Sequence, residues 1–599
     1  MFRSKNFRSA GESAGTLLAV PVALLLMAFA AAPGNLQIVR LAGDTAATNF
    51  KFFVGFKDRK AGSYSISRPE AFLSLRAIER RRAQGIAITE DDFPVDAAYL
   101  RGISVNSVRV LYATRWFNGA VIETTDSLAG EKLRQLPFVK SLEFLGSWKK
   151  QAQVRSRGDR EPYGIDVFNA YKDAEEKSTG WLRNLASRGY GNALGQIDQM
   201  NGIRMHDLGF QGQGRLIAVL DAGFQMVNYL AAFDSLRLQG RILAQKDFVD
   251  FDGSVYNDDD HGTSVLSCMA ANAPGSALGT APRASYLLLR TEDANSEFPI
   301  EESTWARGAE FADSMGADII NSSLGYTRFD LPERFGHTHA ELDGKTTPIT
   351  RAAEMAAARG ILVVNSAGNE GGGDWGRIGA PADGPNVLSV GAVDRLGRNV
   401  YFSSTGPSAD GRIKPDVCAL GEDVWVAGTS GYFSPANGTS FSAPLISGMA
   451  ACLWQALPHL DAAGLRKLII STAQRSAHAD SLYGAGVPDF YGAFCLSGRN
   501  PWFNAAFPQL MSRIPERVTS HELFIRFYSN VEGTYSFQLL MERGRVADLQ
   551  TAAFNKGEHR NIRLRGMSQP GKYTLRVTGP GFASNYPILR SDFSDLYQY

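Results

Sequence analysis

Four short segments, far apart in the chain, carry polar residues whose types suit the transfer of an acyl group. Asp221 ends the apolar run LIAVLD, and His261 follows the acidic loop NDDD. Asn369 lies in the glycine-rich segment SAGNEGGG, and Ser440 lies in NGTSFSAPLISG. A serine hydroxyl is a weak nucleophile at neutral pH, so it needs an imidazole to accept its proton and a carboxylate to orient that imidazole. These segments supply all three groups, and an asparagine amide could donate to a negative oxygen.

Each of these residues also has a simpler structural interpretation when it is taken alone. Asp221 and Asn369 could be turn residues, and Ser440 could only cap the helix that follows it. His261 lies beside three aspartates, so it could be a metal ligand or a solvated loop residue. No H-E-x-x-H motif or paired cysteines supply further ligands, and we assign no metal or other cofactor.

Length and composition exclude several classes of protein. The chain has 599 residues, which is too long for one hydrophobic core, so we expect two to four domains. The formal net charge is +1, whereas general nucleic-acid binding needs a basic surface. We therefore expect no nucleic-acid partner. Four cysteines cannot form a dense disulfide framework, so stability must come mainly from burial.

The N-terminus has the layout of a secretory signal. Three basic residues precede an apolar run at residues 17–30, and small residues follow it. The alternative is an uncleaved membrane anchor, but the run is shorter than the roughly 20 residues needed to span a bilayer and Pro21 interrupts it. We predict a signal peptide at residues 1–32 and a secreted or cell-surface protein.

Three further regions flank or connect the chemistry-bearing segments. Residues 35–150 alternate strand-like runs with a helical patch at 71–83, which predicts a small α+β domain. Three consecutive arginines at 80–82 lie on that helix, where we expect a solvated face, with a ligand site as the alternative. Residues 151–188 are polar and charged, as in a connector. Residues 499–599 have period-2 strands, which predict a β-sandwich.

The region at 189–498 contains all four segments. Its apolar runs LIAVL, SYLLLR, DIINSS, ILVVNS and VLSVGAV alternate with helical stretches, which indicates a parallel, doubly wound α/β sheet covered on both faces. Such sheets bind ligands at the carboxyl ends of their strands. Asp221 and Asn369 follow two of the runs, and we expect a helix to begin at Ser440 with Pro444 in its first turn.

The order Asp, His, Ser along the chain is that of subtilisin. The blocks IAVLDAG, DDDHGTSV, SAGNEG and NGTSFSAPLISG resemble the four signature regions of the subtilisin-like serine peptidases, and the resemblance spans about residues 189–495. It implies that Asp221 orients the imidazole, that His261 is the general base and then the acid, and that Ser440 is the nucleophile. It also implies that Asn369 and the backbone N–H of Ser440 donate to the oxyanion.

The same resemblance implies polypeptide substrates and a cleft that binds them. The implied substrate-binding residues are Ser323, Leu324, Gly325, Ala367, Gly368 and Gly379. The first three would pair with extended substrate backbone, and the set would enclose the side chain that precedes the scissile bond. None of the six is charged, so we expect a preference for apolar or aromatic side chains in that pocket.

Family members commonly carry an N-terminal prodomain that assists folding and blocks the cleft until it is removed. Residues 35–185 lie in the right place for one, which implies self-cleavage in the connector; a retained accessory domain is the alternative. The C-terminal module resembles the sorting domains of bacterial type IX secretion cargo, which implies that machinery as a partner. A stabilising sandwich appended to a secreted enzyme is the alternative there.

Two other functions would fit the same fold. A catalytically silent binding protein could retain it, but such a protein need not preserve a nucleophile, base, acid and oxyanion donor together. An esterase would use the same triad. The sequence therefore predicts a secreted serine endopeptidase.

Overall fold

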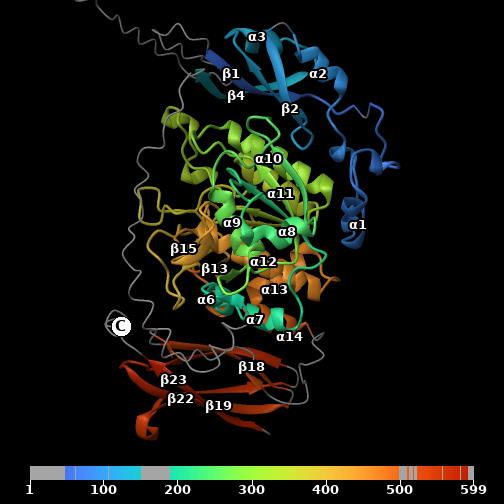
Figure 1. The fold of residues 1–599 in the computed structure, drawn as a ribbon. Coiled ribbons are helices and arrows are strands. Elements are labelled where there is room, and N and C mark those ends of the chain that lie inside the picture. The colour runs from blue at the N-terminus through green and yellow to red at the C-terminus, as the bar shows by residue number, and fades with distance from the viewer. Residues whose placement is uncertain are drawn as a thin grey trace, which may run out of the picture. The chain divides into compact units, whose positions relative to one another are not determined.

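The computed structural model describes residues 48–149 except 61 and 106, residues 189–497 and, with short gaps, residues 509–590. The predicted signal peptide at 1–32 and connector at 151–188 lie outside these residues. Figure 1 follows three regions along the chain: an N-terminal α+β region in blue, a central α/β region from green to orange, and a C-terminal β region in red. Within the described ranges, no helix combines the length and the apolar character needed to cross a bilayer.

Seven parallel strands form the central sheet, in the order β13-β12-β11-β10-β5-β9-β6. Their bounds are β5 Leu216–Asp221, β6 Ile242–Asp247, β9 Ser285–Arg290, β10 Ile319–Ser322, β11 Leu362–Ser366, β12 Leu388–Val393 and β13 Val417–Leu420. In β5, Ile217 and Val219 pack into one hydrophobic core, whereas Leu216, Ala218 and Leu220 pack into a second. Alternate side chains of a strand point to opposite faces, so the sheet has a core on each side and the predicted doubly wound fold is confirmed.

Helices cover both faces of this sheet. Their bounds are α6 Leu194–Asp198, α7 Gly202–Asp207, α8 Asp234–Leu238, α9 His261–Ala270, α10 Ile300–Met315, α11 Pro348–Ala358, α12 Thr439–Ala456, α13 Ala462–Ser471 and α14 Phe490–Leu496. Residues of α9 and α12 belong to the first core, and residues of α10 and α11 belong to the second. Small residues let α12 pass through the core, because a Cβ on Gly448 would lie 1.9 Å from Oγ1 of Thr280.

The N-terminal region contains an antiparallel sheet of order β2-β3-β1-β4. Its elements are β1 Thr48–Phe56, α1 Leu75–Ala83, α2 Ala97–Ile103, β2 Val108–Thr114, β3 Gly119–Thr124, α3 Ala129–Arg134 and β4 Val139–Lys149. The hydroxyl of Ser74 caps α1 by accepting a hydrogen bond from the N–H of Ala77 at 3.1 Å. The region is α+β as predicted.

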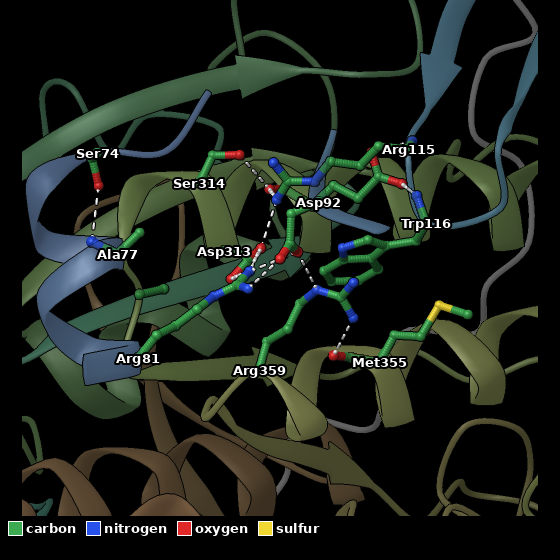
Figure 2. Close-up of polar contacts among 12 residues, drawn as sticks. Ser74, Ala77, Arg81, Asp92, Arg115, Trp116, Asp313, Ser314, Met355 and Arg359 are labelled. Carbon is green, nitrogen blue, oxygen red and sulfur yellow. Dashed lines mark hydrogen bonds and ion pairs between the residues drawn. The ribbon is translucent and has the colours of Figure 1, made fainter. Parts of the chain in front are cut away.

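The predicted solvated face at residues 80–82 is wrong for two of its three arginines. Arg80 and Arg81 of α1 are buried and pair with Asp313 of α10, with N···O distances of 2.5 and 2.8 Å. Arg115, which follows β2, pairs with the same carboxylate at 2.6 Å. Figure 2 shows Arg81 and Arg115 converging on Asp313. The third arginine of the run is exposed, as predicted.

A second buried carboxylate, Asp92, extends this network. It pairs with Arg81 at 2.7 Å and with Arg359, which follows α11, at 3.0 Å (Figure 2). Buried charges are tolerated only when they are paired, and here carboxylates and guanidinium groups compensate one another. The charged face of α1 is therefore an interface with the central domain.

Helix α1 also contacts the loops that precede three strands of the central sheet. Arg76 donates to the carbonyl oxygens of Gly316 and Gly214, at 3.0 and 2.9 Å. Gln84 donates to the carbonyl oxygen of Gly360 at 2.8 Å. These glycines lie just before β10, β5 and β11, at the amino ends of the strands. Helix α1 and the residue that follows it thus hold the amino edge of the sheet, whereas side chains of the N-terminal sheet pack on Phe298 and Ile300 at the start of α10.

The C-terminal region has two sheets, of order β16-β18-β21 and β17-β23-β22-β19-β20. Their strands are β16 Gln509–Leu510, β17 Arg517–Val518, β18 Glu522–Ser529, β19 Gly533–Met541, β20 Val546–Phe554, β21 Glu558–Arg565, β22 Gly571–Gly579 and β23 Phe582–Arg590. Alternate residues of β18 and β19, among them Phe527 and Phe537, share one hydrophobic core. The period-2 pattern therefore marks the inner faces of two packed sheets, as predicted.

Candidate active site

Asp221 and His261 meet at the carboxyl edge of the central sheet. Asp221 ends β5 and is fully buried, and its Oδ1 lies 2.7 Å from Nδ1 of His261, the first residue of α9. An ionised carboxylate can only accept hydrogen bonds, so Nδ1–H of His261 is the donor to Asp221. The other ring nitrogen, Nε2, is therefore left to accept a proton in the cleft. Gly262 permits this approach, because a Cβ there would lie 2.3 Å from the carbonyl oxygen of Gly223.

Ser440 lies in the first turn of α12 and lines the same pocket as His261. The helix begins at Thr439, one residue before the predicted start, and follows Gly438 with φ of 152°, a conformation that favours glycine. The hydroxyl of Ser440 donates to the carbonyl oxygen of Ser323 at 3.4 Å. Ser440 is thus held at a helix N-terminus whose N–H groups are free of helical partners.

Pro444 lies inside α12 rather than in its first turn, so that prediction is wrong. Proline has no N–H, so the carbonyl oxygen of Ser440, four residues earlier, lacks its helical donor. The hydroxyl of Ser323 supplies the missing hydrogen bond at 2.8 Å. The proline therefore ties the start of α12 to the segment that follows β10.

The side chain of Asn369 has a fixed orientation. Its Oδ1 accepts hydrogen bonds from both the N–H and the hydroxyl of Thr439, each at 2.9 Å. Because Oδ1 is occupied, the Nδ2 donor is the group left for the cleft. Asn369 lines the pocket together with His261 and Ser440.

The structure brings all ten sequence-predicted site residues together. Nine of them line one pocket, and Asp221 lies behind His261. Tyr326 and Ala380 exchange backbone hydrogen bonds at 2.9 and 3.2 Å, which joins the segment after β10 to the loop that carries Gly379. The expected substrate-binding residues therefore form one continuous lining.

Sequence reasoning missed several charged residues of this pocket. They are Asp259, Glu292, Glu297, Glu370 and Arg377. The sequence does contain a signal for Glu292 and Glu297. Both lie in the segment TEDANSE, which follows the run SYLLLR and so leaves the sheet at its carboxyl end, where ligands bind.

The electrostatics of the pocket favour a positive charge. Burial alone would lower the pKa of His261, but the charge and hydrogen bond of Asp221, together with the charges of Glu292 and Asp259, raise it to about 9. Burial and repulsion from Asp221 raise the pKa of Glu292 to about 7, although His261 opposes this effect. The imidazole is thus a strong base in a negative environment.

An imidazole, a buried carboxylate and a serine at the start of a buried helix, all at the carboxyl edge of a parallel sheet, are the arrangement of a serine hydrolase. The subtilase family model matches residues 212–486, and the propeptide domain of peptidase family S8 from Bacteroidota matches residues 51–159. The chain belongs to the subtilase family and is a serine endopeptidase with an N-terminal propeptide domain.

The chain is similar to two named subtilisins and to a solved structure. Subtilisin DY of Bacillus licheniformis is 32% identical over 280 residues, which cover 46% of this chain and 88% of that protein. Subtilisin E of Bacillus subtilis (strain 168) is 27% identical over 401 residues, which cover 64% of this chain and 96% of that protein. Among solved structures, MycP1 from Mycobacterium smegmatis is 26% identical, with a TM-score of 0.40, over 50% of this chain and 84% of that chain.

Proposed function

We propose that this chain is a secreted serine endopeptidase that cleaves peptide bonds through an acyl-enzyme on Ser440. The observation that carries the proposal is the 2.7 Å hydrogen bond between Asp221 and His261, beside a serine at the start of α12. The test is hydrolysis of casein or a labelled peptide with and without a serine-reactive sulfonyl fluoride. We expect hydrolysis that the reagent abolishes, and activity resistant to the reagent would exclude a serine nucleophile.

The first chemical step transfers the hydroxyl proton of Ser440 to Nε2 of His261 as Oγ attacks the carbonyl carbon of the substrate. Oγ gives up its hydrogen bond to Ser323 in this step, and Asp221 stabilises the imidazolium that forms. The imidazolium then donates its proton to the leaving amine. Water repeats the sequence on the acyl-enzyme and releases the second product.

Two donors support the tetrahedral oxyanion in this proposal, Nδ2 of Asn369 and the backbone N–H of Ser440. The support for Asn369 is its Oδ1, which two hydrogen bonds from Thr439 hold in place. A donor that is already oriented costs no reorganisation during the reaction, and in a subtilisin one such donor contributes about 100- to 1,000-fold to kcat.

The pH dependence of the reaction is expected to follow His261. Only the neutral imidazole can accept a proton, and the pKa of His261 is raised to about 9. We therefore expect kcat/KM to rise about tenfold per pH unit on the acid side and to level off near pH 9. A pH–rate profile on a labelled peptide measures this, and a midpoint near the ordinary histidine value of about 6.5 would contradict it.

The pocket before the scissile bond is proposed to prefer apolar or aromatic side chains. Its support is that the six residues of the cleft predicted to enclose this side chain, Ser323, Leu324, Gly325, Ala367, Gly368 and Gly379, carry no charge. Cleavage of a peptide library, read by mass spectrometry, is expected to show Phe, Tyr, Leu or Met at this position. A profile dominated by Arg or Lys there would overturn the assignment.

The maturation and export of the chain complete the proposal. A signal peptide at 1–32 would direct export, the domain at 35–150 would block the cleft, and self-cleavage in the connector at 151–188 would release the domain at 189–498. The match to a propeptide domain over residues 51–159 supports the blocking role. The sandwich at 499–599 is proposed as a sorting module for type IX secretion, with structural stabilisation as its alternative.

A further inference from the structure

One wall of the cleft carries carboxylates that the proposed mechanism does not use. Glu292 and Glu297 lie in the loop between β9 and α10, and both line the pocket that contains His261 and Ser440. Glu292 follows β9, whose last residue, Arg290, is level with Asp221 in the neighbouring strand β5. These side chains therefore lie at the same edge of the sheet as the catalytic groups.

The nearby Arg290 is paired with carboxylates other than Glu292. The guanidinium of Arg290 is occupied by three other carboxylates, those of Asp247, Asp250 and Asp258, at 3.3, 2.6 and 3.3 Å. Glu292 itself accepts only a long hydrogen bond, 3.4 Å, from the hydroxyl of Tyr326 among the contacts of the described residues. Its carboxylate thus keeps most of its capacity to bind a cation.

The titration of a neighbouring carboxyl group also reports the negative charge of this wall. Glu301, at the start of α10, is buried, and its Oε2 has no hydrogen-bond partner within the described part of the chain. Burial and the charges of Glu297 and Glu292 raise the pKa of Glu301 to about 10, so Glu301 is protonated and uncharged at neutral pH. Its raised pKa reflects the negative potential of Glu292 and Glu297, and the same potential favours a bound cation.

We propose that Glu292 and Glu297 form a subsite for a lysine or arginine side chain of the substrate, at the position that precedes the residue in the apolar pocket. Successive side chains of an extended peptide point to opposite sides. A peptide paired with the segment at 323–325 therefore turns one side chain to Ala367 and Gly368 and the preceding one toward His261 and Glu292. Charged hydrogen bonds of this kind contribute about 10- to 100-fold to affinity.

This inference rests on the proposed peptidase function and names its substrate class. The experiment compares two labelled peptides that share an apolar residue before the scissile bond and carry either lysine or the neutral, similarly sized norleucine at the preceding position. For the wild-type chain we expect kcat/KM to be about 10- to 100-fold higher for the lysine peptide, mainly through KM. In Glu292→Gln, the ratio of kcat/KM for the lysine peptide to kcat/KM for the norleucine peptide is expected to fall close to one.

Glu370→Gln is the matched control. Glu370 also lines the pocket, but it lies in the loop after β11 beside Asn369, and its replacement should leave the lysine preference unchanged. A wild-type ratio near one, or an unchanged ratio in Glu292→Gln, would overturn the subsite. If the variant fails to fold, the wild-type ratio still decides. Failure to cleave either peptide would instead refute the proposed function.

Discussion

Replacement of Ser440 by alanine is expected to lower kcat for peptide hydrolysis by about a millionfold and to leave the exported chain uncut in its connector. The effect is this large because the acyl-enzyme has no other oxygen on which to form, and in a subtilisin the loss of the nucleophile costs about this much. Hydrolysis of a labelled peptide measures the first effect, and the intact mass of the purified chain measures the second.

Ser442→Ala is the control for this variant. Ser442 lies on the same helix, but its hydroxyl bonds to the carbonyl oxygens of Ala419 and Leu420 in β13, at 3.3 and 3.1 Å. Its loss should cost about 1 kcal/mol of stability and leave the chemistry intact. Wild-type activity in Ser440→Ala would refute the assigned nucleophile, and cutting of pure Ser440→Ala at the wild-type position would refute self-cleavage.

Most strands of the central sheet were predictable because burial gives them apolar segments. Strands β5, β9, β10, β11 and β12 each contain such a segment, and all of their residues except Ser285 are buried. Strand β13 is also buried throughout, but it has four residues and was not predicted. Strand β6 at the sheet edge has the sequence ILAQKD, and three of its six residues are exposed. Its polar composition is that of an edge strand, so no local pattern separates it from a loop.

The residues of the candidate site also divide into those that a local segment marks and those that it does not. Asp221, His261, Asn369 and Ser440 were predictable because each lies in a characteristic local segment at a strand end or helix start. Glu292 was missed although its segment leaves the sheet at the carboxyl end of β9, because no motif marks which residues of that segment line the pocket. The position of Pro444 was misjudged because even a helix that begins at Ser440 has Pro444 as its fifth residue, which lies beyond a first turn of about 3.6 residues.

The three arginines at 80–82 show why contacts between domains escape sequence analysis. A charged helix face has the same pattern whether it meets water or another domain. The partner of Arg80 and Arg81 is Asp313, more than 200 residues away in the chain. No periodicity within α1 encodes that partner, and only the folded interface distinguishes the buried pair from the exposed third arginine.

Replacement of Asp313 by asparagine is expected to destabilise the uncleaved chain by about 3–5 kcal/mol, because it leaves buried arginines without their shared counter-charge. Three arginines, from α1 and from the end of β2, converge on this fully buried carboxylate. Burial opposes its charge, yet the arginines hold the pKa of Asp313 below its ordinary value. The measurement is urea unfolding in the Ser440→Ala background, in which self-digestion cannot interfere.

Asp126→Asn is the matched control, since Asp126 pairs with Lys132 at 2.9 Å on the surface of the same N-terminal region. Surface ion pairs contribute about 0–1 kcal/mol, so this variant should unfold close to the parent. If Asp313→Asn unfolds at the same urea concentration as the control, the buried network does not hold the N-terminal region and the central domain together. If Asp313→Asn unfolds at a lower urea concentration than the control, the N-terminal domain stabilises the peptidase domain through α10. Cleavage that removes this contact should then also weaken the binding of α1 to the amino edge of the sheet.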